Sequence, residues 1–84
     1  MSKLKAAVVG CGFVAQKRHI PSFLRLKRNV TLSALCDLNP RLAEEAGKKF
    51  GVKNVYSNLS EMLSKEDLDI VDICTRRVPM SQLP

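Results

Sequence analysis

The sequence of 84 residues has no tryptophan, one tyrosine and three cysteines, and aromatic residues make up only 5% of it. It has no apolar run long enough to cross a bilayer, so a membrane-spanning helix is excluded. The apolar start resembles a secretory signal, but Gly10 and Gly12 interrupt it and basic residues follow at once. An odd number of cysteines without a C-x-x-C pair fits a reducing compartment. We therefore expect a cytoplasmic protein.

The positive charge of the chain is scattered rather than gathered in one block. Lysine and arginine outnumber the acidic residues and give a formal net charge of +6, which by itself suggests a polyanionic partner. Aromatic residues interleaved with basic ones and known nucleic-acid-binding motifs are both missing. Solvated helix faces and attraction for an anionic cofactor therefore explain the charge better than nucleic-acid binding, which is the less favoured alternative.

Apolar strand patterns alternate with helical patterns along the whole chain. The expected strands cover residues 5–10, 31–37, 52–56 and 68–75. The expected helices cover residues 13–28, 40–50 and a short stretch that begins at 58–61. This alternation predicts an α/β domain of three layers with a parallel sheet of about four strands in the order 3-2-1-4. Pro21 predicts a kink in the first helix, because proline has no backbone N–H.

Local signals mark the ends of the second and third helices. Asn39 is a capping residue followed by Pro40, which is favoured at the first helical position. Gly51 follows the last apolar position of that helix and can adopt the left-handed conformation of a helix end. Asn58 and Glu61 have the spacing of a capping box, which predicts the start of the third helix.

A G-x-G-x-x-A pattern follows the first expected strand and opens the first expected helix. Gly10 allows a tight turn out of the strand, Gly12 allows backbone to approach a pyrophosphate, and Ala15 allows close packing of helix on strand. Free N–H groups around Phe13 and Val14 would then face the phosphates, helped by the helix dipole. By itself the pattern is weak evidence for dinucleotide binding, so it needs support from the residues before and after it.

An acid at the end of the second strand supplies that context. Asp37 lies 22 residues after Ala15, where a dinucleotide-binding fold needs a carboxylate for the ribose hydroxyls of adenosine. A carboxylate there also repels a 2′-phosphate, so we expect NAD in preference to NADP. Leu38 follows where a phosphate-binding protein would more often have arginine, although Arg41 is near enough to complicate this. The glycine turn and Asp37 together predict a partial Rossmann fold. The alternative is that Asp37 is only a solvated acid in a turn, which explains Asp37 but not the glycine turn.

The three cysteines are interpreted as small, buried and unreactive. Cys11, Cys36 and Cys74 all map to the carboxyl ends of expected strands, so they can lie in one neighbourhood. They lack the spacing of metal ligands, and we therefore predict no metal site.

The remaining candidate residues for acid–base or metal chemistry are interpreted as structural. His19 lies beyond the first turn of its helix and has no evident acidic partner to orient it, so packing or surface placement is expected. The acids near the fourth strand are interpreted as loop and strand-edge residues: Asp67, Asp69 and Asp72.

Several stretches of the sequence, in order, resemble the Gfo/Idh/MocA oxidoreductases, a family that includes glucose-fructose oxidoreductase and inositol dehydrogenases. The matching stretches are residues 7–15, 19–21, 35–40, 50–52, 56–58 and 71–75. The resemblance covers residues 5–75 and implies the family's N-terminal nicotinamide-binding domain. In full-length relatives this domain serves hydride transfer between nicotinamide and a sugar or polyol.

The resemblance also implies roles for individual residues. It assigns pyrophosphate binding to Gly10, Gly12 and Ala15, and the strand-end acid to Asp37. Thr75 matches the threonine of a Thr-Pro-Pro loop that lies close to the cofactor in relatives. After Thr75 the sequence departs from the family, because residues 76–80 read Arg-Arg-Val-Pro-Met instead of Pro-Pro followed shortly by histidine. The family's Glu-Lys-Pro segment and substrate domain have no counterpart in the sequence.

We therefore expect residues 1–75 to form the N-terminal part of an NAD(P)-binding Rossmann-like domain, and residues 76–84 to be an aberrant tail from a truncation or a frameshift. No catalytic residue is assigned, so binding of the dinucleotide without turnover is expected. A different class of function is also open. The exposed edge of the fourth strand could pair with another copy and make the chain a homo-oligomeric interaction module without cofactor.

Overall fold

The computed structural model describes residues 3–12 and 15–74. Its strands are β1 (Leu4–Val9), β2 (Val30–Cys36), β3 (Asn54–Tyr56) and β4 (Ile70–Ile73). Its helical segments are η1 (Ala15–His19), α1 (Ile20–Arg25), α2 (Pro40–Phe50) and α3 (Leu59–Lys65). The four strands are parallel and form one sheet in the order β3-β2-β1-β4. The predicted fold class and strand order are therefore confirmed.

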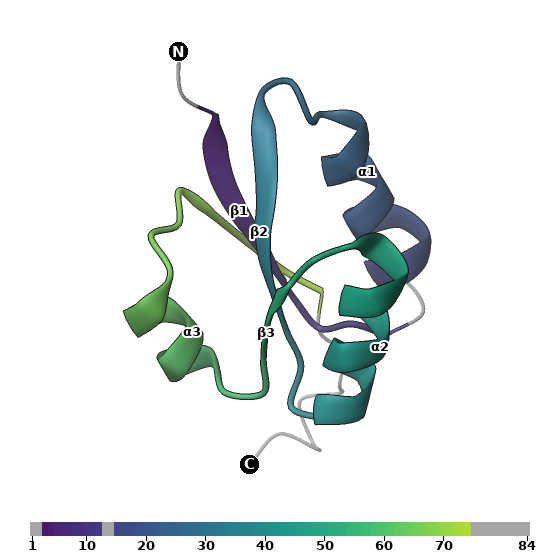
Figure 1. Cartoon of the computed structure of the whole chain (residues 1–84), viewed down its shortest axis with the longest axis vertical. Coiled ribbons are helices and arrows are strands. Elements are labelled where there is room, and N and C mark those ends of the chain that lie inside the picture. The colour runs from purple at the N-terminus through teal and green to yellow at the C-terminus, as the bar shows by residue number, and fades with distance from the viewer. Residues whose placement is uncertain (1–2, 13–14, 75–84) are drawn as a thin grey trace, which may run out of the picture.

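Helices cover both faces of the sheet, so the domain has three layers (Figure 1). Alternate residues of the central strand β1 enter different cores, since successive side chains of a strand point to opposite faces. Val8 packs in a cluster with Leu35, Ile20 and Ala46 on the side of α1 and α2. Ala7 and Val9 pack on the other side in the cluster that contains Met62 of α3. Burial on both faces explains why β1 reads as a nearly continuous apolar run.

Both predicted ends of α2 and the predicted start of α3 are confirmed. The Asn39 side chain accepts a bond from the Arg41 amide at 3.0 Å, and Gly51 ends α2 with φ of 73°. The Asn58 side chain accepts a bond from the Glu61 amide at 2.9 Å. These side chains satisfy amides that have no partner within the helix.

The first helix differs from its prediction of one helix over residues 13–28. It has a π-helical turn, η1, followed by the short helix α1, and it ends at Arg25. Pro21 explains the change of helix type, because it has no N–H and its ring crowds the carbonyl of the preceding turn. A turn that includes a bond from the Asn29 amide to the Leu26 carbonyl at 2.8 Å then leads into β2.

Candidate functional site

The glycine turn leaves β1 at the sheet edge where the strands end. Gly10 has φ of 95°, a conformation that favours glycine, and its amide donates to the Cys36 carbonyl at 2.7 Å. The turn is therefore fixed to the carboxyl end of β2. This is the end of an open parallel sheet at which ligands bind.

Asp37 connects the glycine turn to the start of the loop before α2. Its Oδ2 accepts a hydrogen bond from the backbone amide of Cys11 at 2.7 Å, and its Oδ1 accepts one from the amide of Asn39 at 2.8 Å. The side chain is half-buried, whereas Leu38 beside it is 90% exposed. Each carboxylate oxygen has a second lone pair, so the group can accept further hydrogen bonds. The structure thus brings together Asp37 and the glycine turn, as the sequence predicted.

Gly12 leaves open space where a side chain would be. A Cβ built at Gly12 has no heavy atom within 4 Å, so packing in the described structure does not require a glycine at this position. Gln16 anchors the turn, with its Nε2 donating to the Cys11 carbonyl at 2.8 Å and its amide to the Gly12 carbonyl at 3.0 Å. Ala15 is buried against the core that contains Val8, as its packing role requires.

These residues fit a dinucleotide, since open space at Gly12 can accept a diphosphate and Asp37 can accept hydrogen bonds from ribose hydroxyls. The other three predicted contacts, Phe13, Val14 and Thr75, lie outside the described residues.

The three thiols surround the same end of the sheet. Burial and then the charge of Asp37 raise the pKa of Cys11 to about 12, and the same causes raise the pKa of Cys36. Burial and then the charge of Asp72 raise the pKa of Cys74 to about 11. The neutral thiol is therefore the form at neutral pH, and thiolate is the reactive form. The raised pKa values favour this unreactive form, but the prediction that all three cysteines are buried was wrong for Cys74, which is only half-buried.

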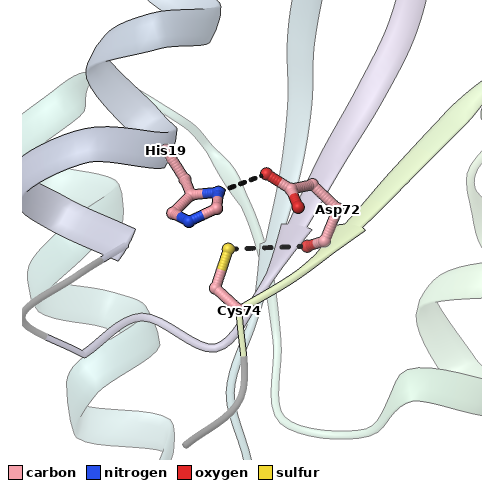
Figure 2. Close-up of side chains that lie close together, drawn as sticks. All are labelled: His19, Asp72 and Cys74. Carbon is pink, nitrogen blue, oxygen red and sulfur yellow. Dashed lines mark hydrogen bonds and ion pairs between the residues drawn. The ribbon is translucent and has the colours of Figure 1, made fainter.

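His19 has an acidic partner, which the sequence analysis missed. Its Nδ1 lies 2.7 Å from Oδ2 of Asp72 in β4, and the Cys74 thiol lies beside the pair (Figure 2). The expectation that His19 lacks an orienting acid was therefore wrong. Asp72 lies on the edge strand β4, as predicted, and its side chain faces the side of the sheet that α1 covers. Its partner on β1 is Val8, which packs on that side with Ile20. The residues are 53 positions apart, so only the position of β4 beside β1 could have suggested the contact.

Comparison with known proteins identifies the family. Residues 4–82 match the sequence profile of the Gfo/Idh/MocA group, described as an oxidoreductase family with an NAD-binding Rossmann fold. The chain belongs to this family. Among its curated relatives, a D-apiose dehydrogenase of Paraburkholderia graminis is 35% identical over 75 residues, which cover 89% of the chain and 20% of the relative. A D-glucoside 3-dehydrogenase of Escherichia coli is 31% identical over 74 residues, which cover 88% of the chain and 21% of the relative.

Solved structures of proteins with similar sequences have the same fold. The WlbA dehydrogenase of Bordetella pertussis, in complex with NADH and UDP-GlcNAcA, is 30% identical with a TM-score of 0.81, and the match covers 88% of the chain and 22% of the dehydrogenase. An oxidoreductase of Agrobacterium radiobacter, in complex with NAD⁺, L-tartaric acid and magnesium, is 29% identical with a TM-score of 0.81. The match covers 89% of the chain and 21% of the oxidoreductase. The chain thus spans about a fifth of the length of these relatives. Within residues 3–12 and 15–74, no helix combines the length and hydrophobicity that crossing a membrane requires.

Proposed function

We propose that the chain binds NAD at the carboxyl ends of β1 and β2, as the nucleotide-binding domain of a Gfo/Idh/MocA oxidoreductase. The observation that carries this proposal is the pair of bonds by which Asp37 holds the amides of Cys11 and Asn39. They fix the carboxylate beside the glycine turn, so that its remaining lone pairs can accept hydrogen bonds from ribose hydroxyl groups. Complexes of two relatives with NADH or NAD⁺ support the choice of cofactor.

The chain's own residues would hold the dinucleotide in two places. Gly12 would let the diphosphate approach the backbone, because a Cβ there would project into the open space. Asp37 would bind the adenosine ribose and disfavour a 2′-phosphate by like charge, so NAD would bind more tightly than NADP. The nicotinamide, when bound, would supply the hydride chemistry that relatives apply to sugars or polyols. We propose that the 84 residues bind the cofactor without turning over substrate.

Calorimetric titration with NAD and NADP tests the proposal. Asp37→Ala should weaken NAD binding about 10- to 100-fold, the effect of losing a charge-assisted hydrogen bond. Asp37→Asn keeps an acceptor for the Cys11 amide but loses the charge, so it should also raise NADP affinity relative to NAD. Asp67→Asn, at an exposed acid outside the site, is the matched control. Equal affinity of the wild-type chain and Asp37→Ala for NAD would contradict the assignment.

A second candidate function is self-association through β4. In the described sheet, β4 pairs with β1 alone, and its Val71 and Ile73 are 37% and 60% exposed. A strand edge with apolar side chains can pair with another strand. Sedimentation equilibrium tests this function, and Val71→Lys should make any such oligomer dissociate. A monomer at high concentration would contradict it without affecting the proposal of NAD binding.

A further inference from the structure

Three chemically different metal-ligating side chains meet where β4 ends. A ring nitrogen of His19, a carboxylate oxygen of Asp72 and Sγ of Cys74 all lie within 4.8 Å of one another (Figure 2). All three residues are half-buried. We propose that His19, Asp72 and Cys74 form a binding site for a divalent metal ion of the zinc type.

The donor atoms match this class of ion. Zinc accepts imidazole nitrogen, thiolate sulfur and carboxylate oxygen, and sites with three protein ligands leave a fourth position for water or another small ligand. Bond lengths of about 2.0–2.3 Å in a tetrahedral site separate the ligand atoms by roughly 3.3–3.8 Å. Nδ1 of His19 and Oδ2 of Asp72, which are 2.7 Å apart, would move slightly apart, and Sγ of Cys74 would move closer to them. Side-chain rotations provide movements of this size without a change of fold.

The backbone holds two of the ligands firmly. Asp72 belongs to β4, and the Cys74 amide donates to the Val9 carbonyl of β1 at 2.7 Å. His19 ends η1 where α1 begins. Ligands on regular elements keep their relative positions, which reduces the cost of ordering them when the ion binds.

The surroundings leave room for the fourth ligand. A surface hollow of about 240 Å³ is lined by His19 and Asp72 together with Arg18, Ser22, Phe23 and Leu26. Arg18 opposes a cation by its charge, but it also favours an anionic fourth ligand on the bound ion. Water or a small carboxylate would suit this position.

An activated thiol is the alternative chemistry for the same three residues. A nucleophilic thiol needs a base that takes its proton. His19 Nδ1 instead pairs with Oδ2 of Asp72 at 2.7 Å, and the Cys74 thiol donates to the backbone carbonyl of Asp72 at 3.9 Å. The convergence of three different donor atoms therefore favours the metal ion.

Titration of the full chain with Zn²⁺ and with Co²⁺, in the absence of any dinucleotide, tests the site. We expect one ion per chain and, with Co²⁺, the near-ultraviolet absorption of sulfur-to-metal charge transfer. Cys74→Ser should remove that absorption, while the thiol control Cys36→Ala should keep it. His19→Gln and Asp72→Asn should each weaken Zn²⁺ binding about 10- to 100-fold or more, and Asp67→Asn should leave it unchanged.

A second measurement needs no variant. His19 is the single histidine of the sequence, so its ring resonances in the wild-type protein should shift when one equivalent of Zn²⁺ is added. Unshifted histidine resonances, or a charge-transfer band that survives Cys74→Ser, would overturn the site. Because the titration contains no NAD, either result leaves the proposed cofactor function unaffected.

Discussion

The Asp37 carboxylate accepts a hydrogen bond from the Cys11 amide at 2.7 Å across 26 positions of sequence. The same carboxylate accepts the Asn39 amide, so one side chain fixes the turn after β1 and the turn after β2. The residue proposed to bind ribose is therefore also a structural residue of the unliganded domain. Its substitution should change both binding and stability.

Asp37→Ala should lower the free energy of unfolding by about 1–3 kcal/mol, because two backbone amides lose a charged acceptor. Asp37→Asn should cost less, since its single side-chain oxygen can still accept one amide. Urea unfolding followed by circular dichroism measures both effects, and Asp67→Ala is the exposed control. Equal stability of Asp37→Ala and the control would mean that the two bonds contribute nothing to the fold.

Substitution by alanine should lower the stability of the protein at one glycine and its NAD binding at another. A Cβ at Gly47 would lie 2.7 Å from Cγ1 of Val55 and 2.8 Å from the Val52 carbonyl oxygen. Gly47→Ala should therefore destabilise the protein by about 1–3 kcal/mol, although alanine is the better helix former. Gly12→Ala meets open space and should leave stability within about 0.5 kcal/mol while abolishing NAD binding. Thermal unfolding with and without NAD separates the two effects, and loss of stability in Gly12→Ala would refute its proposed role.

Features set by nearby residues were predictable from the sequence. Asn39 and Gly51 mark both ends of α2, because caps act through the hydrogen bonds and backbone angles of the helix itself. The strand order followed from the alternation of strands and helices. The nearness of Asp37 to the glycine turn followed from that order, since neighbouring parallel strands end at one edge.

Features set by tertiary packing were not predictable. Pro21 predicted a disturbance of the first helix, but the sequence does not specify a π-helical turn. That turn is selected where the chain must both pass Pro21 and bury Ile20 completely. The contact of His19 with Asp72 likewise depends on how the segment after β1 crosses the edge strand, which no local signal encodes.

The His19–Asp72 pair should contribute a modest coupling energy in the metal-free protein. The two side chains are 38% and 28% exposed, and solvent screens a pair at that depth, so about 0.5–1 kcal/mol is expected. A double-mutant cycle with His19→Gln and Asp72→Asn, measured with a chelator present, isolates the coupling. Additive effects of the two substitutions would show that the contact adds no stability. Addition of Zn²⁺ should stabilise the wild-type protein more than any of the three variants, because each variant binds the ion more weakly.

Tyr56 gives the fold a pH dependence at alkaline pH. Its hydroxyl donates to Oε2 of Glu66 at 2.5 Å. That hydrogen bond, followed by burial and the charge of Glu66, raises the pKa of Tyr56 from 10.0 to about 12. The neutral hydroxyl is therefore favoured in the folded state. Its contribution to stability is complete below pH 10 and is lost as the pH rises towards 12.

The single tyrosine and the absence of tryptophan make tyrosinate absorbance a direct measurement of this titration. The folded wild-type chain should ionise well above the urea-unfolded chain. Glu66→Gln removes the negative charge and the carboxylate acceptor, so its tyrosine should ionise closer to the unfolded value. Tyr56→Phe should abolish the signal and flatten the stability profile between pH 10 and 12. If Glu66→Gln titrated like the wild type, the hydrogen bond to Glu66 could not be the cause of the raised pKa.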